Sequence, residues 1–64
     1  MNWKLRFTKK GTFVDFYNDK REVILTRKFL GWQTRGWEDT ILLPKFETRP
    51  GEKVSIDEDE IYIN

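Results

Sequence analysis

The chain has 64 residues, carries a formal net charge of only +1, and contains no Cys and no His. A domain of this size buries only a small core, and without Cys or His it has neither disulfides nor the usual zinc ligands to stabilise it. The same absences also exclude His-based catalytic triads, thiolate nucleophiles and His general bases. The core must instead come from three Trp, five Phe and two Tyr. We therefore expect a non-enzymatic single domain over residues 1–64, with no cofactor and no metal.

No segment of the sequence is suited to a membrane or to export. The longest apolar run, Ile41–Leu43, is far shorter than the stretch of about 20 residues that a membrane-spanning helix needs. The first residues lack the apolar stretch and the small-residue cleavage site of a signal peptide. We therefore expect a cytoplasmic protein without a membrane partner.

The charges are distributed unevenly along the chain. Residues 1–37 hold nine Lys and Arg against three Asp and Glu, whereas residues 38–64 hold three against eight. Such a division is typical of a basic face for an anionic partner. It is equally typical of strands from the two halves that pair opposite charges across a sheet. The charge pattern leaves both interpretations open.

The first elements in chain order predict a β-hairpin. Trp3–Phe7 alternates apolar and basic or polar residues, which is the period of a strand with one apolar face. Lys9–Gly11 predicts a tight turn, because glycine takes a positive φ without steric cost. Thr12–Tyr17 predicts the second strand, which is apolar on both faces around Asp15. Such a strand lies at the centre of a small barrel, or one of its faces meets a partner.

The segment 20–30 allows two interpretations. After a polar turn at Asn18–Arg21, the alternation in Glu22–Leu30 predicts a strand. The alternative is a short helix over 20–30, with Asp19 as its N-cap and Gly31 at its end. The Val-Ile-Leu-Thr cluster favours the strand, because β-branched side chains lose rotamer freedom in a helix.

The second half of the chain predicts shorter elements between strong turn signals. Gly31–Trp37 repeats Gly-Trp at an interval of five residues, which predicts an irregular loop or a bulged bend in a strand. Thr40–Phe46 predicts a strand in which Pro44, lacking an amide proton, marks an edge, a strand end or a bulge. The Pro-Gly pair in Arg49–Glu52 is typical of a type II turn. The remaining predictions are strands at Lys53–Ile56 and Ile61–Ile63, separated by a turn or single helical turn at Asp57–Glu60.

Six short strands separated by Gly, Pro and Asx turns predict an all-β fold, a small antiparallel barrel of five or six strands. The length favours an SH3-like barrel over an OB-like one, because OB folds are usually longer. The helix alternative at 20–30 would instead make the fold α+β.

The basic and aromatic residues of the first half give the candidate site. Single-stranded nucleic acid is bound by cations that follow the phosphates and by aromatic rings on which bases stack. The sequence therefore predicts a binding module for single-stranded nucleic acid, in which the cations neutralise phosphates and the two tryptophans stack. The candidate binding residues are Lys4, Arg6, Lys9, Lys10, Lys28, Trp32, Arg35 and Trp37.

Two alternatives use the same features with a protein partner. Trp and Arg are enriched at the hot spots of protein interfaces. The Trp32–Trp37 loop, or the acidic run Asp57–Glu60, would then dock on a larger protein, as in an inhibitor or adaptor. A homo-oligomer, in which the basic N-terminal strand of one copy meets the acidic C-terminal strand of another, is the third hypothesis.

Overall fold

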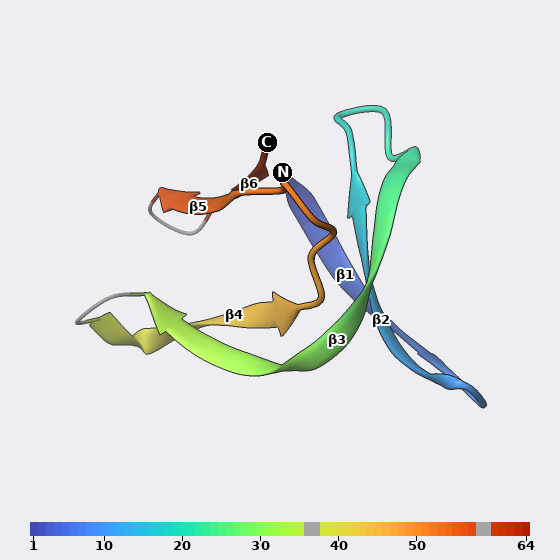
Figure 1. Cartoon of the computed structure of the whole chain (residues 1–64), viewed down its shortest axis with the longest axis horizontal. Coiled ribbons are helices and arrows are strands. Elements are labelled where there is room, and N and C mark those ends of the chain that lie inside the picture. The colour runs from blue at the N-terminus through green and yellow to red at the C-terminus, as the bar shows by residue number, and fades with distance from the viewer. Residues whose placement is uncertain (36–37, 58–59) are drawn as a thin grey trace.

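The computed structural model describes residues 1–35, 38–57 and 60–64, and the side chains of residues 35–41 fall outside that description. The described residues form six strands in two antiparallel sheets, so the all-β prediction is confirmed. The first sheet has the order β1-β2-β3-β4, and β5 pairs with β6 in the second (Figure 1). The strands are β1 (Asn2–Thr8), β2 (Gly11–Tyr17), β3 (Val23–Arg35), β4 (Glu38–Phe46), β5 (Val54–Asp57) and β6 (Glu60–Ile63).

The segment 20–30 is a turn followed by a strand, so the helix alternative is wrong. The amide of Asn18 donates to the carbonyl of Glu22 at 3.1 Å, which closes the turn before β3 begins at Val23. The β-branched residues that follow suit the pleated backbone better than a helix. The described part of the chain contains no helix that is long and apolar enough to cross a membrane.

Strand β3 is long and bent, and it belongs to both halves of the first sheet. Its first half pairs with β2 and its second half with β4, as Figure 1 shows. The register shifts between Phe29 and Gly31, and Gly31 has a φ of 141°, a conformation that glycine adopts without strain. For residues 31–35 the bulged strand bend is therefore confirmed. Gly36 and Trp37 lie outside the described residues.

The core lies on the inward face of the bent sheet, where it is covered by β6. Phe16 is completely buried and meets the ring of Phe46 edge-on, with ring centroids 5.0 Å apart. Partly buried side chains such as Trp3 and Leu25 pack around this centre. The buried apolar residues of the core are Val14, Phe16, Leu43, Phe46 and Ile61.

Phe7 lies on the apolar face that the alternation in β1 predicts, but it is not buried there. It shares that face with Trp3 and Leu5, but it remains 76% exposed, whereas those two are half-buried. Its cross-strand partner is Thr12, near the tip of the hairpin. The first hairpin thus extends beyond the part of the sheet that the core covers.

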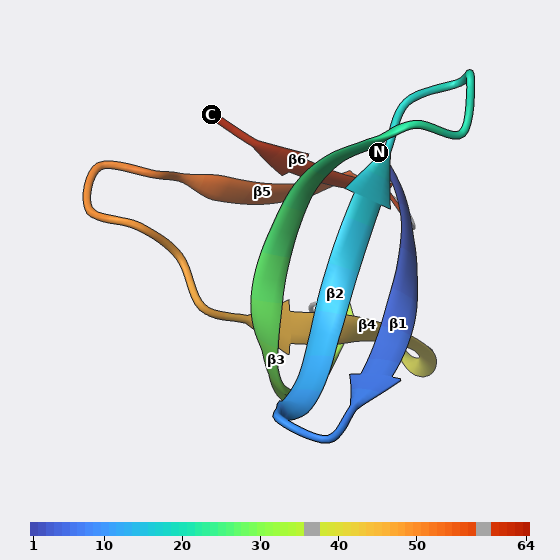
Figure 2. The same ribbon diagram turned by 90° about the vertical axis from the view of Figure 1, so that its right-hand side faces the viewer.

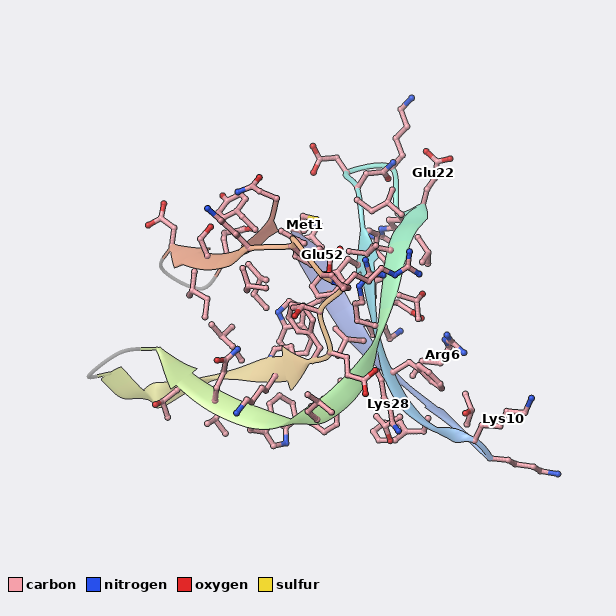
Figure 3. All side chains as sticks on the ribbon, viewed as in Figure 1. Met1, Arg6, Lys10, Glu22, Lys28 and Glu52 are labelled. Carbon is pink, nitrogen blue, oxygen red and sulfur yellow. The ribbon has the colours of Figure 1, made fainter. Side chains whose placement is uncertain are left out.

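Polar contacts join the second sheet to the first. The N-terminal amino group of Met1 donates to the carbonyl of Ile61 at 2.9 Å and to Glu60 at 2.7 Å. The buried guanidinium of Arg27 on β3 donates to Glu52, which precedes β5, at 2.5 Å. Figure 3 labels Met1 and Glu52 where they bridge the sheets.

Two predictions about local geometry in the second half are confirmed. In the turn at Arg49–Glu52 the amide of Glu52 donates to the carbonyl of Arg49, and Gly51 has a φ of 87°, as a type II turn requires. Pro44 lies in β4, the edge strand of the first sheet, which is a position in a sheet that tolerates proline.

Candidate functional site

The outward face of β1, β2 and β3 collects cations and aromatic rings. Residues that pair directly across antiparallel strands point to the same side of the sheet. Arg6 on β1, Phe13 on β2 and Lys28 on β3 form one such row. Lys4 belongs to the next row, two residues along β1. Figure 2 shows the three strands side by side toward the viewer, with β4 crossing behind them.

A buried carboxylate holds the middle of this outward face together. Asp15 is only 8% exposed, and it accepts hydrogen bonds from Arg6 Nε at 2.8 Å and Thr26 Oγ1 at 2.7 Å. The hydrogen bond from Arg6 lowers the pKa of Asp15 below its usual range, against the opposing effect of burial. Asp15 is therefore ionised at neutral pH, and it balances the charge of Arg6.

Arg6 is also placed over an aromatic ring. Its guanidinium carbon lies 5.2 Å from the centroid of Phe13, within the range of a cation–π contact. Arg6 is thus paired with Asp15 and lies against this ring, while half of its side chain remains exposed.

A pocket of about 320 Å³ opens beside Phe13 at one end of the face. Lys28 supplies one cation to its wall, and Arg49 supplies another from the connection between β4 and β5. Glu52 holds this connection in place, since it accepts from the amide of Arg49 at 2.8 Å and from Arg27. The contact with Arg27, followed by the amide of Arg49, lowers the pKa of Glu52. The pocket is lined by Phe13, Thr26, Arg27, Lys28, Glu47, Thr48 and Arg49.

A second pocket, of about 440 Å³, lies at the other end of the same face. Tyr17 on β2 contributes the ring, while Lys4 on β1 and Arg21 from the turn before β3 contribute cations. Asn2 completes the wall, and it pairs directly with Tyr17 across the two strands. Each pocket therefore has an aromatic ring beside at least two cations, and the wall of the first pocket also includes Arg27 and the carboxylate of Glu47.

The structure brings only some of the predicted site residues together. Lys4, Arg6 and Lys28 share the outward face of the sheet. Lys9 and Lys10 lie at the hairpin turn, and Figure 3 shows Lys10 at the far tip of the molecule. These two lysines extend the basic surface beyond the end of the sheet.

Trp32 is separated from these cations by the sheet itself. Its ring meets Trp3 at 6.2 Å and Phe29 at 5.3 Å between centroids, both in edge-on geometry. Trp3 belongs to the face of β1 opposite Lys4, so Trp32 lies on the inward side, where it stays half exposed. The side chain of Arg35 and the whole of Trp37 lie outside the described residues.

Four side chains of the outward face are absent from the predicted site. The sequence does carry a signal for the two rings, because Phe13 and Tyr17 alternate with buried residues on either side of Asp15, a charge that marks the outward face. Arg21 and Arg49 have no such signal, since each reaches the face from a connection between strands.

Neither a metal site among the described residues nor a similar known protein points to a function. No group of three His, Cys, Asp or Glu side chains in the described part of the chain could hold a metal ion. The acidic run Asp57–Glu60 includes residues 58–59, which lie outside the description. No family model matches the chain, and no curated protein or solved structure is significantly similar to it.

Proposed function

We propose that the outward face of β1, β2 and β3 binds single-stranded nucleic acid. The observation that carries the proposal is the pocket beside Phe13, in which an accessible ring lies next to the cations Lys28 and Arg49. The ion pairs among the described side chains involve neither of these two cations. Neither charge is therefore neutralised by a direct ion pair, although Glu47 lies in the same wall.

The chemistry of the face suits a single strand better than a duplex. Unpaired bases can stack on an aromatic ring, and each stack contributes roughly 1–3 kcal/mol. In a duplex the bases are already stacked and paired, so a ring on the surface of a sheet cannot reach their faces. The arrangement of rings on the strands, with cations around them, is the one that small β folds use for single strands.

The proposal is tested by binding of a fluorescently labelled oligothymidine, measured by anisotropy at about 50 and 200 mM salt, a range over which phosphate contacts weaken strongly. Each phosphate contact adds about 0.7 to the slope of log affinity against log salt for single strands. We expect Lys28→Ala and Lys4→Ala each to reduce the slope by about that amount.

The matched control is Lys53→Ala, which removes the same charge just before β5, outside the face. If Lys53→Ala reduces the slope as much as Lys28→Ala, binding is a property of net charge and the assigned face is wrong. If the wild-type chain does not bind at the lower salt concentration, the proposed function is wrong.

We further propose that the two sheets form an SH3-like barrel. Two observations support closure: β3 continues from one half of the first sheet into the other, and the amino group of Met1 donates to the carbonyl of Ile61 on β6. A solution structure by NMR with hydrogen bonds between β1 and β6 would support the closed form. An open edge along β1 would refute it.

A protein partner is the second candidate, and it would use the opposite side of the sheet. Trp32 is half exposed beside Trp3, and an exposed tryptophan on a rigid cluster is typical of an interface hot spot. In this case Trp32→Ala leaves oligonucleotide affinity unchanged. If Trp32→Ala instead lowers the affinity for the oligonucleotide, Trp32 is part of the nucleic-acid site.

A further inference from the structure

We infer that the pocket around Tyr17 is a second nucleotide subsite, so that one nucleic-acid strand runs along β2 with a base in each pocket. The inference rests on the proposed function and extends it to the length and path of the ligand. Tyr17 lies beside Lys4 and Arg21, as Phe13 lies beside Lys28 and Arg49 in the first pocket, and the wall of the second pocket contains no carboxylate.

The spacing of the two rings sets the length of strand that can fill both pockets. Phe13 and Tyr17 are four residues apart on β2, which corresponds to about 13–14 Å of strand. Each pairs with an outward residue of β1, Arg6 for Phe13 and Asn2 for Tyr17, so the rings share one face. A fully stacked strand, at about 3.4 Å per step, covers this distance with five nucleotides. A strand whose bases are unstacked to lie on the rings is more extended and needs fewer, but the single step of a dinucleotide does not reach about 13 Å.

The turn before β3 holds Arg21 in a conformation that an arginine rarely adopts. Its φ is 64°, in the left-handed region that favours glycine. The turn enforces this geometry through Asn18, whose side-chain oxygen accepts from the amides of Lys20 and Glu22 at 3.0 Å each. The carbonyl of Asn18 also accepts from the amide of Arg21 at 3.1 Å.

This strained arginine is an independent reason to regard the second pocket as a binding site. Strained backbone persists where the surrounding structure enforces it, and it concentrates at ligand sites. Glycine would satisfy the turn at Arg21 at no conformational cost, but it would remove a cation from the wall of the pocket. The side chain therefore has a use that the turn itself does not require.

The carboxylate of Asp15 lowers the net positive charge in the middle of the face. Asp15 balances Arg6 there, and Thr26 donates its hydroxyl to the same carboxylate. Lys4 pairs directly across from Asp15 and lines the pocket at Tyr17 with Arg21, whereas Lys28 and Arg49 line the pocket at Phe13. Each pocket thus has accessible cations of its own, which suits a ligand held at two points. Two-point binding predicts an affinity that rises steeply once a strand is long enough to reach both pockets.

The test compares labelled oligothymidines of two and six nucleotides on the full chain at low salt. We expect the hexanucleotide to bind at least about tenfold more tightly than the dinucleotide, because only it fills both pockets. Tyr17→Leu should weaken the hexanucleotide complex by about 5- to 150-fold, the size of one lost base stack, and remove most of the gain in affinity with length.

A second variant separates binding from folding. Arg21→Gly should weaken the hexanucleotide complex and reduce its salt slope by about 0.7, while the unfolding midpoint stays the same or rises. The matched control is Lys20→Gly, which removes the same charge from the same turn but does not line the pocket, and which should leave the affinity unchanged.

The possible outcomes test the second subsite separately from the proposed binding of single-stranded nucleic acid. If Phe13→Leu weakens the hexanucleotide complex whereas Tyr17→Leu and Arg21→Gly do not, the second subsite is refuted and the proposed function stands. If the wild-type chain does not bind the hexanucleotide at all, the proposed function fails and the subsite fails with it.

Discussion

Two phenylalanines on the first hairpin allow a direct test of where the core lies. Phe7 on β1 and Phe16 on β2 both point to the inward side of the sheet, yet Phe7 is 76% exposed and Phe16 is completely buried. Leucine preserves the apolar character of either position and removes the ring. We expect Phe16→Leu to destabilise the fold and Phe7→Leu to have little effect.

The size of the effect follows from what surrounds each ring. Phe16 packs edge-on against Phe46 at 5.0 Å, a contact worth about 0.5–1.5 kcal/mol beyond area burial. The change of shape in a buried position costs up to about 1.5 kcal/mol more. We therefore expect Phe16→Leu to lower the free energy of unfolding by about 2 kcal/mol, against a few tenths for Phe7→Leu.

This loss is large for such a small protein. At about 0.05–0.15 kcal/mol per residue, a domain of this length has a total stability of roughly 3–10 kcal/mol. A loss of about 2 kcal/mol should lower the thermal midpoint by about 8–16 °C. Urea unfolding followed by tryptophan fluorescence and thermal unfolding followed by circular dichroism would measure both quantities.

The comparison between the two variants contains its own control. Both remove the same atoms from the same hairpin, so a general effect on hairpin formation would appear in both. Equal losses in Phe7→Leu and Phe16→Leu would refute the burial difference, and with it the extension of the hairpin tip beyond the core.

Three further predictions concern charges and backbone. Because the fold lowers the pKa of Asp15, its carboxylate stabilises the fold above its unfolded pKa of about 3.9, and this contribution is lost as pH falls through the lower folded value. Asp15→Asn should therefore have a lower free energy of unfolding than wild type at pH 7, and the two free energies should become equal in acid. A difference between them that persists in urea titrations at the lowest pH would contradict this prediction. Glu52→Gln should weaken the contact with the buried guanidinium of Arg27 and speed amide exchange in the connection before β5. The double variant Arg27→Met with Glu52→Leu should be at least as stable as Glu52→Gln alone, because it leaves no buried charge without a partner. A less stable double variant would show that the ion pair itself stabilises the fold more than apolar side chains do in its place. Gly31→Ala should lower the free energy of unfolding by roughly 1–2 kcal/mol, because alanine is strained at a φ of 141°. The added methyl itself has room, since no atom lies within 4 Å of it. An unchanged unfolding midpoint would show that this backbone conformation does not affect stability.

The sequence by itself determined the strands and most of the turns. Alternation in β1 and the β-branched cluster in β3 identify their strands, because side chains on successive residues of a strand face opposite sides. The Pro-Gly pair at residues 50–51 predicted its turn correctly, because the proline ring fixes φ at the first position and glycine, without a Cβ, accepts the positive φ at the second. These features depend on residues close together in the chain, so a linear sequence is sufficient to predict them.

The tertiary structure alone decided which faces became core and which became a site. Strand β2 is apolar on both sides, and only the packing of β4 and β6 against one side buries Phe16 and leaves Phe13 accessible on the other. The bend at Gly31 turns Trp32 toward Trp3, away from the cations with which the sequence grouped it. Burial depends on which distant segments meet, and that is set by the path of the whole chain in space.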